Sequence, residues 1–415
     1  MKYVLKCITC AREFESNPKA STCPDCGAFK GTLDVIYPIE DIRKDAGDEL
    51  AFRRNVSVFR SFLPILPLAD IFDLPPIIVG DTPIFQSPAL SQLTGIENLW
   101  IKDDGRNPSA SLKDRASAIA IAMATEAGAS IIATASTGNA ASSLATLAAS
   151  VSMKAVLFVP RDIPQPKLAQ LLIHGAHVLK LDCDYDSAFD LCQTACEKFG
   201  WYNRNSAVNP FTGEGKKTAA LEIARDLGGA PDTVVCPVGD GCIIGGLYKG
   251  FSDLKELGLT DKMPRLYGIQ AEGASPVVKA FQDNDEIKPT EAKTMADSIS
   301  VGYPRDGVKA LRAVKKSDGA MIAVSDDEIM EAQKILAAKG GIFAEPAASA
   351  AMAGMIRLLK KEDIEPQEKV VLLITGHGLK DIEAAFRNIQ TDLEIIKPNI
   401  KSVENKIKQV LKTEL

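Results

Sequence analysis

The chain has 415 residues, of which 46% are apolar and 25% are charged, and its formal net charge is −6. This length exceeds what one hydrophobic core usually spans, so we expect more than one domain. The acidic balance and the absence of Lys/Arg blocks argue against nucleic-acid and membrane-surface partners. No apolar run reaches the roughly 18 residues of a membrane span and no signal-peptide core is present, so we expect a cytoplasmic protein.

Four of the nine cysteines lie near the N-terminus as two Cys-x-x-Cys pairs. The pairs are Cys7 with Cys10 and Cys23 with Cys26. Two such pairs at this spacing can turn four sulfurs toward one tetrahedral ion, which favours zinc over redox thiols. A four-cysteine site leaves no open position on the metal, so we expect a structural, zinc-ribbon-like segment over residues 1–40.

Residues 38–90 are rich in proline, and we expect a wrapping segment that ends at a strand or turn near Thr82 and Pro83. From about residue 99 the chain alternates short apolar runs with Ala-rich stretches. The predicted strands are 130–136, 154–160, 177–181, 232–238, 265–271, 320–324 and 369–375. The predicted helices are 113–128, 139–150, 216–228, 325–339 and 346–361, with a surface helix in the tail after 389. This alternation predicts an α/β fold whose parallel sheets are covered on both faces.

In open α/β sheets ligands bind beyond the carboxyl ends of the strands, and three such loops here have unusual composition. The loop at residues 136–139, "STGN", offers hydroxyls, an amide and free backbone N–H groups to an anion, although ordinary N-capping explains it about as well. The loop at 239–243, "GDGCI", has glycines that let a phosphate approach the start of a helix. It matches neither a Walker loop nor a dinucleotide fingerprint.

The third loop is "TGHGLKD", residues 375–381, which places the hydroxyl of Thr375 at a strand end. His377 lies between two glycines, so we expect it to serve through its backbone rather than as a general base. Taken together, the three loops provide a phosphate site, an anion site and a hydroxyl at one edge of the predicted sheets.

Lys113 ends the stretch "NPSASLK" where a predicted helix begins. A lysine at the positive end of a helix is misplaced as a surface charge. The same field, with partial desolvation, lowers the pKa of the lysine and favours the neutral amine that forms a Schiff base. By comparison, the pairs Lys216-Lys217 and Lys360-Lys361 are interpreted as helix-surface charges. Lys113 and the three loops together predict pyridoxal 5'-phosphate as the cofactor.

The segments "NPSASLKDRAS", "ASTGNAASS", "PVGDGCIIGG", "QAEGASP", "FAEPAASAA" and "TGHGLKD" together resemble the threonine synthase family. This family belongs to the fold-type-II (tryptophan synthase β-like) pyridoxal-phosphate enzymes, and an N-terminal ribbon also occurs in it. The resemblance implies two parallel-sheet α/β domains with the N-terminal zinc-ribbon-like appendage, and a homodimer. The implied division is a ribbon at 1–40, a large cofactor-binding domain at 41–109 and 211–415, and a small domain at 110–210.

The resemblance also implies roles for single residues. Lys113 would hold the cofactor and move protons, Asn139 would bond its 3′-oxygen, and Thr375 would face its pyridine nitrogen. The cofactor phosphate would be held by Gly239, Asp240, Gly241, Cys242 and Ile243. The carboxylate and phosphate of the substrate would be bound by Ser136, Thr137, Asn205 and Ser206.

Four positions depart from the family pattern. Thr212 stands where the family often has an arginine that holds the substrate phosphate, and Arg204 or Lys216 could replace it. Cys242 and Ile243 replace a Gly and an Asn in the phosphate loop, and Tyr303 replaces an Asn.

The implied reaction converts O-phospho-L-homoserine and water to L-threonine and phosphate, with no metal at the reacting atoms. Two alternatives stay open within the superfamily, a serine/threonine dehydratase and a cysteate synthase that acts on phosphoserine. Release of phosphate or of ammonia separates the first alternative from the implied reaction. A third interpretation is a zinc-ribbon interaction protein whose α/β body has lost catalysis, and it predicts a colourless protein.

Overall fold

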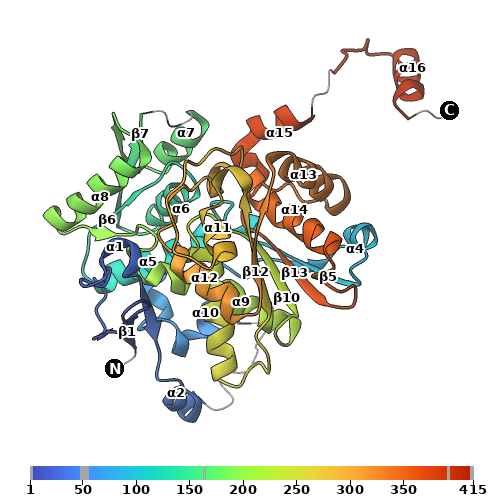
Figure 1. The fold of residues 1–415 in the computed structure, drawn as a ribbon. Helices are drawn as coiled ribbons and strands as arrows, with labels where there is room; N and C mark the ends of the chain where they lie inside the picture. Colours follow the sequence, from blue (N-terminus) through green and yellow to red (C-terminus); the bar gives the residue numbers. More distant parts are fainter. Residues whose placement is uncertain (1–2, 47–55, 162, 164, 390–392, 412–415) are drawn as a thin grey trace. The chain divides into compact units, whose positions relative to one another are not determined.

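The structure is a computed structural model that describes residues 3–46, 56–161, 163, 165–389 and 393–411. Met1–Asp381 form one compact unit and Ile382–Leu415 form a second, and each is described by itself. The second unit contains helices α15 (Ile382–Ile389) and α16 (Ile400–Leu411), which confirms the helix expected in the tail (Figure 1). Within the described residues, no helix is both long and apolar enough to cross a membrane.

The largest sheet of the first unit has six strands in the order β12-β11-β10-β13-β5-β4. Every neighbouring pair is parallel except β4 with β5, which is antiparallel. The strands are β4 (Ile84–Gln86), β5 (Asn98–Asp103), β10 (Thr233–Pro237), β11 (Arg265–Ala271), β12 (Ala320–Val324) and β13 (Lys369–Ile374). The last four confirm predicted strands, whereas β5 was not predicted because its buried Lys102 and Asp103 interrupt the apolar run.

Two layers of helices cover this sheet, as Figure 1 shows on either side of β10 and β13. In β13, Val371 and Leu373 belong to the core that contains α5, α9 and α10. Val370 and Leu372 belong to the second core, with α13 and α14. This period-2 alternation between two apolar cores confirms a parallel sheet buried on both faces. The covering helices are α5 (Lys113–Glu126), α9 (Phe211–Leu227), α10 (Cys242–Glu256), α12 (Gly307–Lys316), α13 (Asp326–Gly340) and α14 (Pro346–Lys360).

A second sheet has four parallel strands in the order β8-β7-β6-β9. Its strands are β6 (Ile131–Ala135), β7 (Lys154–Pro160), β8 (His177–Leu181) and β9 (Tyr202–Asn203), of which the first three were predicted. The helices of this part of the chain are α6 (Asn139–Ala148), α7 (Gln165–Ile173) and α8 (Tyr185–Phe199). The two-sheet α/β class is therefore confirmed, while the division into domains at 110–210 stays a prediction.

The N-terminal segment forms an antiparallel sheet in the order β2-β1-β3. Its elements are β1 (Val4–Cys7), β2 (Glu13–Phe14), α1 (Gly27–Lys30) and β3 (Leu33–Ile36). Leu5 and Val35 are buried in the same core as α9, and Tyr3 packs edge-on against Phe211, with 5.8 Å between ring centroids. The ribbon is therefore joined to the body through apolar contacts.

The segment that follows the ribbon contains two short helices, α2 (Ile39–Ala46) and α3 (Val58–Ser61), and residues 47–55 of the predicted wrapping segment lie outside the described residues. Phe62, Ile65 and Leu66 are fully buried in the core that contains α5 and α9. The described part of this segment therefore packs its apolar side chains into the body.

Helix α9 begins at Phe211, five residues before the predicted start. The prediction placed the start too late because Gly213 and Gly215 give this stretch the composition of a loop. A Cβ at Gly215 would lie 2.1 Å from the carbonyl oxygen of Arg115, so glycine there permits close packing of α9 on α5. Lys216 and Lys217 are fully buried between α5 and α10, so the interpretation of this pair as surface charges was wrong. Lys360 and Lys361, by contrast, are exposed.

A buried charge network joins β5, α5 and α9. Arg115 Nε lies 2.6 Å from an Asp104 carboxylate oxygen, and Arg115 Nη1 lies 2.5 Å from Glu222. Lys102 Nζ lies 2.6 Å from the other Glu222 oxygen, and all four side chains are fully buried. Burial raises the pKa of Glu222, but the charges of Arg115 and Lys102 outweigh burial and hold it well below its usual range. Buried charges of this kind are tolerated when each has a partner.

We predict that Arg115→Ala lowers the free energy of unfolding by about 3–5 kcal/mol, because it leaves Asp104 and Glu222 buried without their principal cation. Chemical denaturation of the purified protein measures this change. Arg161→Ala is the control, because Arg161 pairs with Asp182 in solvent and should cost less than about 1 kcal/mol. Equal losses in the two variants would contradict the structural role given to the network.

Candidate functional site

The carboxyl ends of β5, β13 and β10 are neighbours in the large sheet, so the loops that follow them converge. Leu112 N donates to the carbonyl oxygen of Thr375 at 2.9 Å, and His377 N donates to that of Ala110 at 3.1 Å. Ser111 and Gly376 form an isolated antiparallel bridge between these bonds. The turn before Lys113 is therefore fixed to the turn after β13.

Lys113 is the first residue of α5 and is partly buried. Ala110, three residues earlier, has φ +62°, a left-handed conformation that is strained for a residue with a Cβ. Burial, and then the positive charge of Lys216, lower the pKa of the Lys113 amine to about 8. The neutral fraction of this amine near physiological pH is therefore much larger than that of an exposed lysine.

The loop after β10 leads into α10, which begins at Cys242 with Gly241 as its N-cap. Gly241 has φ +97°, and a Cβ there would lie 2.5 Å from the carbonyl oxygen of Asp306. Only glycine fits this position without displacing the backbone. The first backbone N–H groups of this 15-residue helix are available to an anion, which fits a phosphate group.

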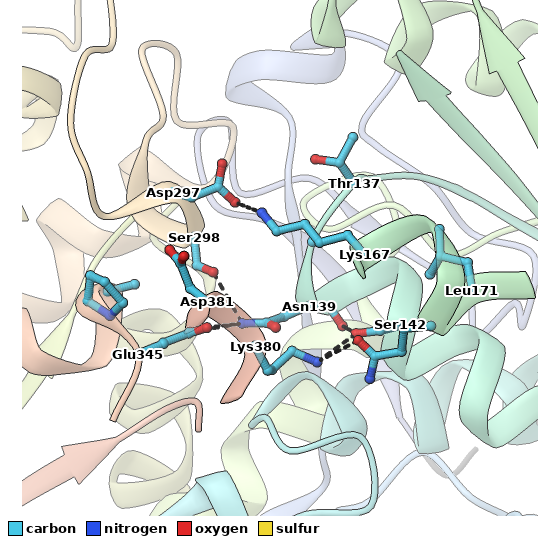
Figure 2. Close-up of a pocket in the computed structure, with 14 residues that line it drawn as sticks. Thr137, Asn139, Ser142, Lys167, Leu171, Asp297, Ser298, Glu345, Lys380 and Asp381 are labelled. Carbon is cyan, nitrogen blue, oxygen red and sulfur yellow. Dashed lines mark hydrogen bonds and ion pairs between the residues drawn. The ribbon is translucent and has the colours of Figure 1, made fainter. Parts of the chain in front are cut away.

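Asn139, the first residue of α6, faces a carboxylate that was not assigned a role from the sequence. Asn139 Nδ2 donates to Glu345 Oε1 at 2.9 Å and to Ser298 Oγ at 3.2 Å, as Figure 2 shows. Glu345 is buried and burial raises its pKa, while the bond from Asn139 opposes that shift. A Cβ at Gly376 would lie 2.4 Å from Glu345 Oε1, so Glu345 contacts the turn after β13.

These residues surround one cavity. It is lined by the side chains or backbone of all the predicted cofactor residues, namely Lys113, Asn139, Gly239, Asp240, Gly241, Cys242, Ile243 and Thr375. Ser298 and Glu345 also line it. Burial raises the pKa of Asp240, and it raises that of the Cys242 thiol to about 12, so the thiol is neutral near physiological pH. An amine, N–H donors and a hydroxyl in one cavity fit the aldehyde, phosphate and ring nitrogen of pyridoxal phosphate.

A wider cavity continues from Lys113 between the two parallel sheets. All four predicted substrate residues line it, together with Arg204, Tyr303 and Arg305. Asn205 Oδ1 accepts hydrogen bonds from Thr134 Oγ1 and from Ala135 N, both at 2.8 Å, so its amide oxygen is held at the end of β6. Ser206 Oγ accepts a hydrogen bond from Lys216 Nζ at 3.3 Å.

Lys380 is a second residue that the sequence analysis missed. Its amine donates to the carbonyl oxygen of Ser109 at 2.7 Å. It also donates to Ser142 Oγ at 2.9 Å, as Figure 2 shows. Burial lowers the pKa of Lys380, while the charge of Glu345 opposes the shift. Lys380 thus links the loop before Lys113 to α6, which carries Asn139.

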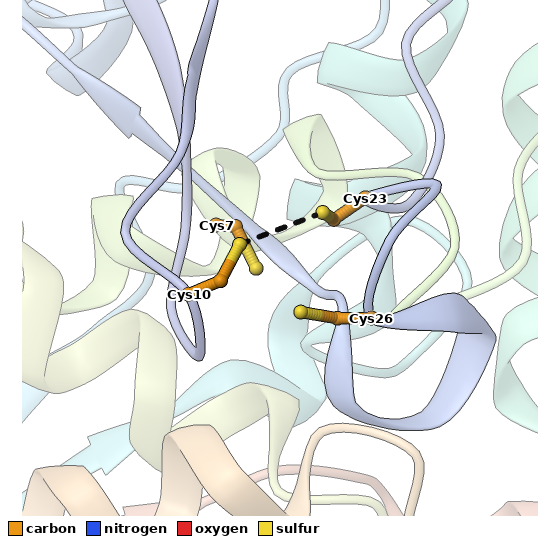
Figure 3. A group of neighbouring side chains, drawn as sticks. All are labelled: Cys7, Cys10, Cys23 and Cys26. Carbon is orange, nitrogen blue, oxygen red and sulfur yellow. Dashed lines mark hydrogen bonds between the residues drawn. The ribbon is translucent and has the colours of Figure 1, made fainter.

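The four N-terminal cysteines lie together at the end of the ribbon (Figure 3). Their Sγ atoms are all within 4.8 Å of one another, and those of Cys10 and Cys23 are 3.8 Å apart. A tetrahedral ion with Zn–S bonds of about 2.3 Å requires sulfur separations of about 3.8 Å. The cluster therefore has the donor atoms and spacing to hold one metal ion.

We predict that Lys113 of the cofactor-free protein reacts with an amine-specific reagent about tenfold faster for each pH unit up to about pH 8, and levels off above it. Its depressed pKa places the neutral amine in this range, whereas exposed lysines continue to gain reactivity toward pH 10. Peptide mass spectrometry measures both in one sample. A Lys113 profile that follows the exposed lysines would contradict the environment described above.

Comparisons with known proteins agree with this geometry. A family model described as pyridoxal-phosphate dependent enzyme matches residues 77–376. The chain is 36% identical to threonine synthase of Methanocaldococcus jannaschii over 408 residues, which is 96% of this chain and 99% of the relative. It is also 36% identical to threonine synthase of Methanosarcina acetivorans over 411 residues, 98% of each chain.

Two solved structures share the fold. The processed form of threonine deaminase isoform 2 from Solanum lycopersicum has a TM-score of 0.66 and 22% identity, covering 83% of this chain and 93% of its own. Maize serine racemase has a TM-score of 0.66 and 19% identity, covering 75% and 92%. These similarities concern the fold alone, whereas the sequence matches cover almost the whole chain. The chain therefore belongs to the family of pyridoxal-phosphate dependent enzymes, and its resemblance to the threonine synthases is confirmed.

Proposed function

We propose that this protein is a threonine synthase that converts O-phospho-L-homoserine and water to L-threonine and phosphate. The observation that carries the proposal is that one cavity contains Lys113, the N-terminus of α10 and the hydroxyl of Thr375 at the end of β13. The threonine synthases matched over almost the whole chain support this choice among the pyridoxal-phosphate enzymes.

The residues present fit pyridoxal phosphate. When bound, this cofactor supplies an electron sink for charge that develops on the substrate carbons. Lys113 would hold the cofactor and then move protons at the substrate carbons. The backbone N–H groups at residues 239–243 would hold the cofactor phosphate, Asn139 would bond its 3′-oxygen, and Thr375 would present a neutral hydroxyl to its ring nitrogen.

The substrate would occupy the wider cavity. Ser136 and Thr137 at the start of α6 offer hydroxyls and backbone N–H groups to the carboxylate, and Asn205 and Ser206 face the same space. Because Lys113 lines both cavities, its amine would lie between the cofactor and the substrate and could move protons there. No metal ion is required at the reacting atoms in this scheme.

We predict that the purified protein releases phosphate and L-threonine in equal amounts from O-phospho-L-homoserine. Lys113→Ala should lower kcat by at least about 10³-fold with an unchanged circular dichroism spectrum, because Lys113 borders a cavity rather than the core. Colorimetric phosphate and chromatographic threonine assays measure both products. Lys360→Ala, on the exposed end of α14, is the control.

Three outcomes would redirect the assignment. Ammonia released from threonine or serine without phosphate release would favour a dehydratase. Phosphate released from phosphoserine would favour a cysteate synthase, and a colourless protein that never takes up the cofactor would favour the zinc-ribbon interaction protein. Normal turnover by Lys113→Ala would remove Lys113 from its proposed role.

We further propose that Cys7, Cys10, Cys23 and Cys26 bind a structural zinc ion. Phe29, in the helix that follows Cys26, packs on the ring of Tyr303 with 4.5 Å between centroids. Lys30 pairs with Glu286 at 2.8 Å. Because Tyr303 lines the wider cavity, the ribbon supports one wall of the proposed substrate site. The homodimer and the cytoplasmic location stay predictions.

We predict that zinc removal by a chelator raises amide exchange in residues 3–40 and raises KM for the substrate a few-fold, while turnover continues. The metal closes the ribbon, and the ribbon contacts the cavity only through its wall. Cys10→Ser should reproduce both effects, and Cys183→Ser, outside the cluster, should reproduce neither. Immediate and complete loss of activity on chelation would contradict a purely structural ion.

A further inference from the structure

Lys216 differs from the other fully buried lysines of the described chain in its partners. Lys102 has the carboxylate of Glu222 at 2.6 Å, and Lys217 has that of Asp253 at 2.8 Å. Lys216 is equally buried, yet the one polar contact that the described residues give its amine is the hydroxyl of Ser206 at 3.3 Å. A buried positive charge without a counter-charge is costly, so the surroundings of Lys216 favour an anionic ligand.

The position of Lys216 places its charge beside the candidate active site. A Cβ at Gly246 would lie 2.9 Å from the Cβ of Lys216, so the lysine packs directly against the first turns of α10. Ser206 Oγ, its hydroxyl partner, lies 3.4 Å from Nη1 of the fully buried Arg204. Ser206, Arg204 and Lys113 all line the wider cavity.

The charge of Lys216 affects the pKa of two groups in the site. After burial it is the largest influence that lowers the pKa of Lys113, and the charge of Arg204 acts in the same direction. Lys216 also opposes the burial that raises the pKa of Cys242. Cys242 and Asp240 oppose part of this effect at Lys113.

Among the described residues of α9, those near Lys216 offer no second uncompensated charge. Thr212, one turn before Lys216, is uncharged, and its hydroxyl donates to the carbonyl oxygen of Asn209 at 2.9 Å. Lys217, the next residue, is neutralised by Glu214 and Asp253. The lysine at 216 is thus the one on α9 whose charge is left for a ligand, within the residues that the structure describes.

We propose that Lys216 supplies, through Ser206 and together with Arg204, the positive charge of a subsite for the phosphate group of the substrate. This proposal rests on the proposed function, because it assigns a site to the group that the reaction releases. The cofactor phosphate is the other anion within reach. It is served by the N–H groups that open α10, whereas Ser206 and Arg204 line the wider cavity and not the cofactor cavity.

Lys216 is therefore a positioning residue, and calorimetric titration of the holoenzyme with inorganic phosphate tests its role without turnover. Lys216→Gln should weaken phosphate binding by at least about tenfold, equivalent to about 1.4 kcal/mol. Lys216→Arg, which keeps the charge, should restore most of it. Lys249→Gln is the matched control, because Lys249 is on α10 but already pairs with Asp253. Lys216→Met is the second uncharged variant if Lys216→Gln is poorly folded.

Three further measurements distinguish the substrate phosphate from the cofactor phosphate as the anion that Lys216 attracts. Affinity for pyridoxal phosphate should change less than twofold in Lys216→Gln, and KM for O-phospho-L-homoserine should rise more than kcat falls. The pH at which the visible absorbance of the holoenzyme changes should shift upward, since a positive charge is lost near Lys113. Unchanged phosphate affinity would overturn the proposal, and so would an equal loss of cofactor affinity, which would assign the charge to the cofactor.

Failure of the proposed function gives a different result. If wild-type protein binds inorganic phosphate in a Lys216-dependent manner but does not convert O-phospho-L-homoserine, the phosphate subsite stands and the reaction assignment fails. If it converts that substrate and Lys216→Gln binds phosphate as well as wild type, the reaction stands and the subsite fails.

Discussion

The buried pairing of Arg115 with Asp104 and Glu222 is the constraint on which the site depends. Asp104 follows β5, Glu222 is in the middle of α9, and Arg115 is two residues after Lys113. One guanidinium therefore fixes the end of a central strand and two helices against each other. Because it lies in the first turn of α5, it also fixes where the helix begins, and hence where the amine of Lys113 emerges.

The same helix pair determines the electrostatics of the cavity. Close packing of α9 on α5 and α10 requires glycine at 215 and 246, and it leaves the lysines of α9 no route to solvent. Lys217 is paired with Glu214 on the same helix and with Asp253 on α10, so its charge is compensated within the fold. The partner of Lys216 is the hydroxyl of Ser206, in the turn before α9, so its charge acts on Lys113 instead. Two adjacent identical residues thus have different roles, because each faces a different neighbour.

Much of this arrangement could be predicted from the sequence. Apolar runs such as 265–271 and 320–324 coincide with strands of the large sheet. The three loops of unusual composition all contribute residues to the cofactor cavity or to the wider cavity. Local patterns report the intrinsic preference of a segment and the apolar face that it buries. They therefore locate strands and helix starts well.

The features that were missed depend on contacts between distant segments. Strand β5 contains Lys102, whose burial requires a glutamate 120 residues later in the chain. Glu345 and Lys380 act through Asn139, Ser109 and Ser142, none of which is near them in sequence. In a local sequence pattern, a charged residue predicts a solvent-exposed position. Only the tertiary structure shows that the charge is buried and that it is paired or acts on a neighbouring group.

The ribbon can be understood in the same way. Tyr303, a departure from the family pattern, places its ring on Phe29 and lines the wider cavity. An asparagine could not make this aromatic contact, so Tyr303 gives the ribbon a packing partner that the family pattern lacks. Asp34 of β3 adds an ion pair with Arg312 at 2.6 Å, and Lys309 donates to the carbonyl oxygen of Leu33 at 2.7 Å. The ribbon that carries the four thiols therefore supports one wall of the wider cavity, because Phe29 packs on a residue that lines it.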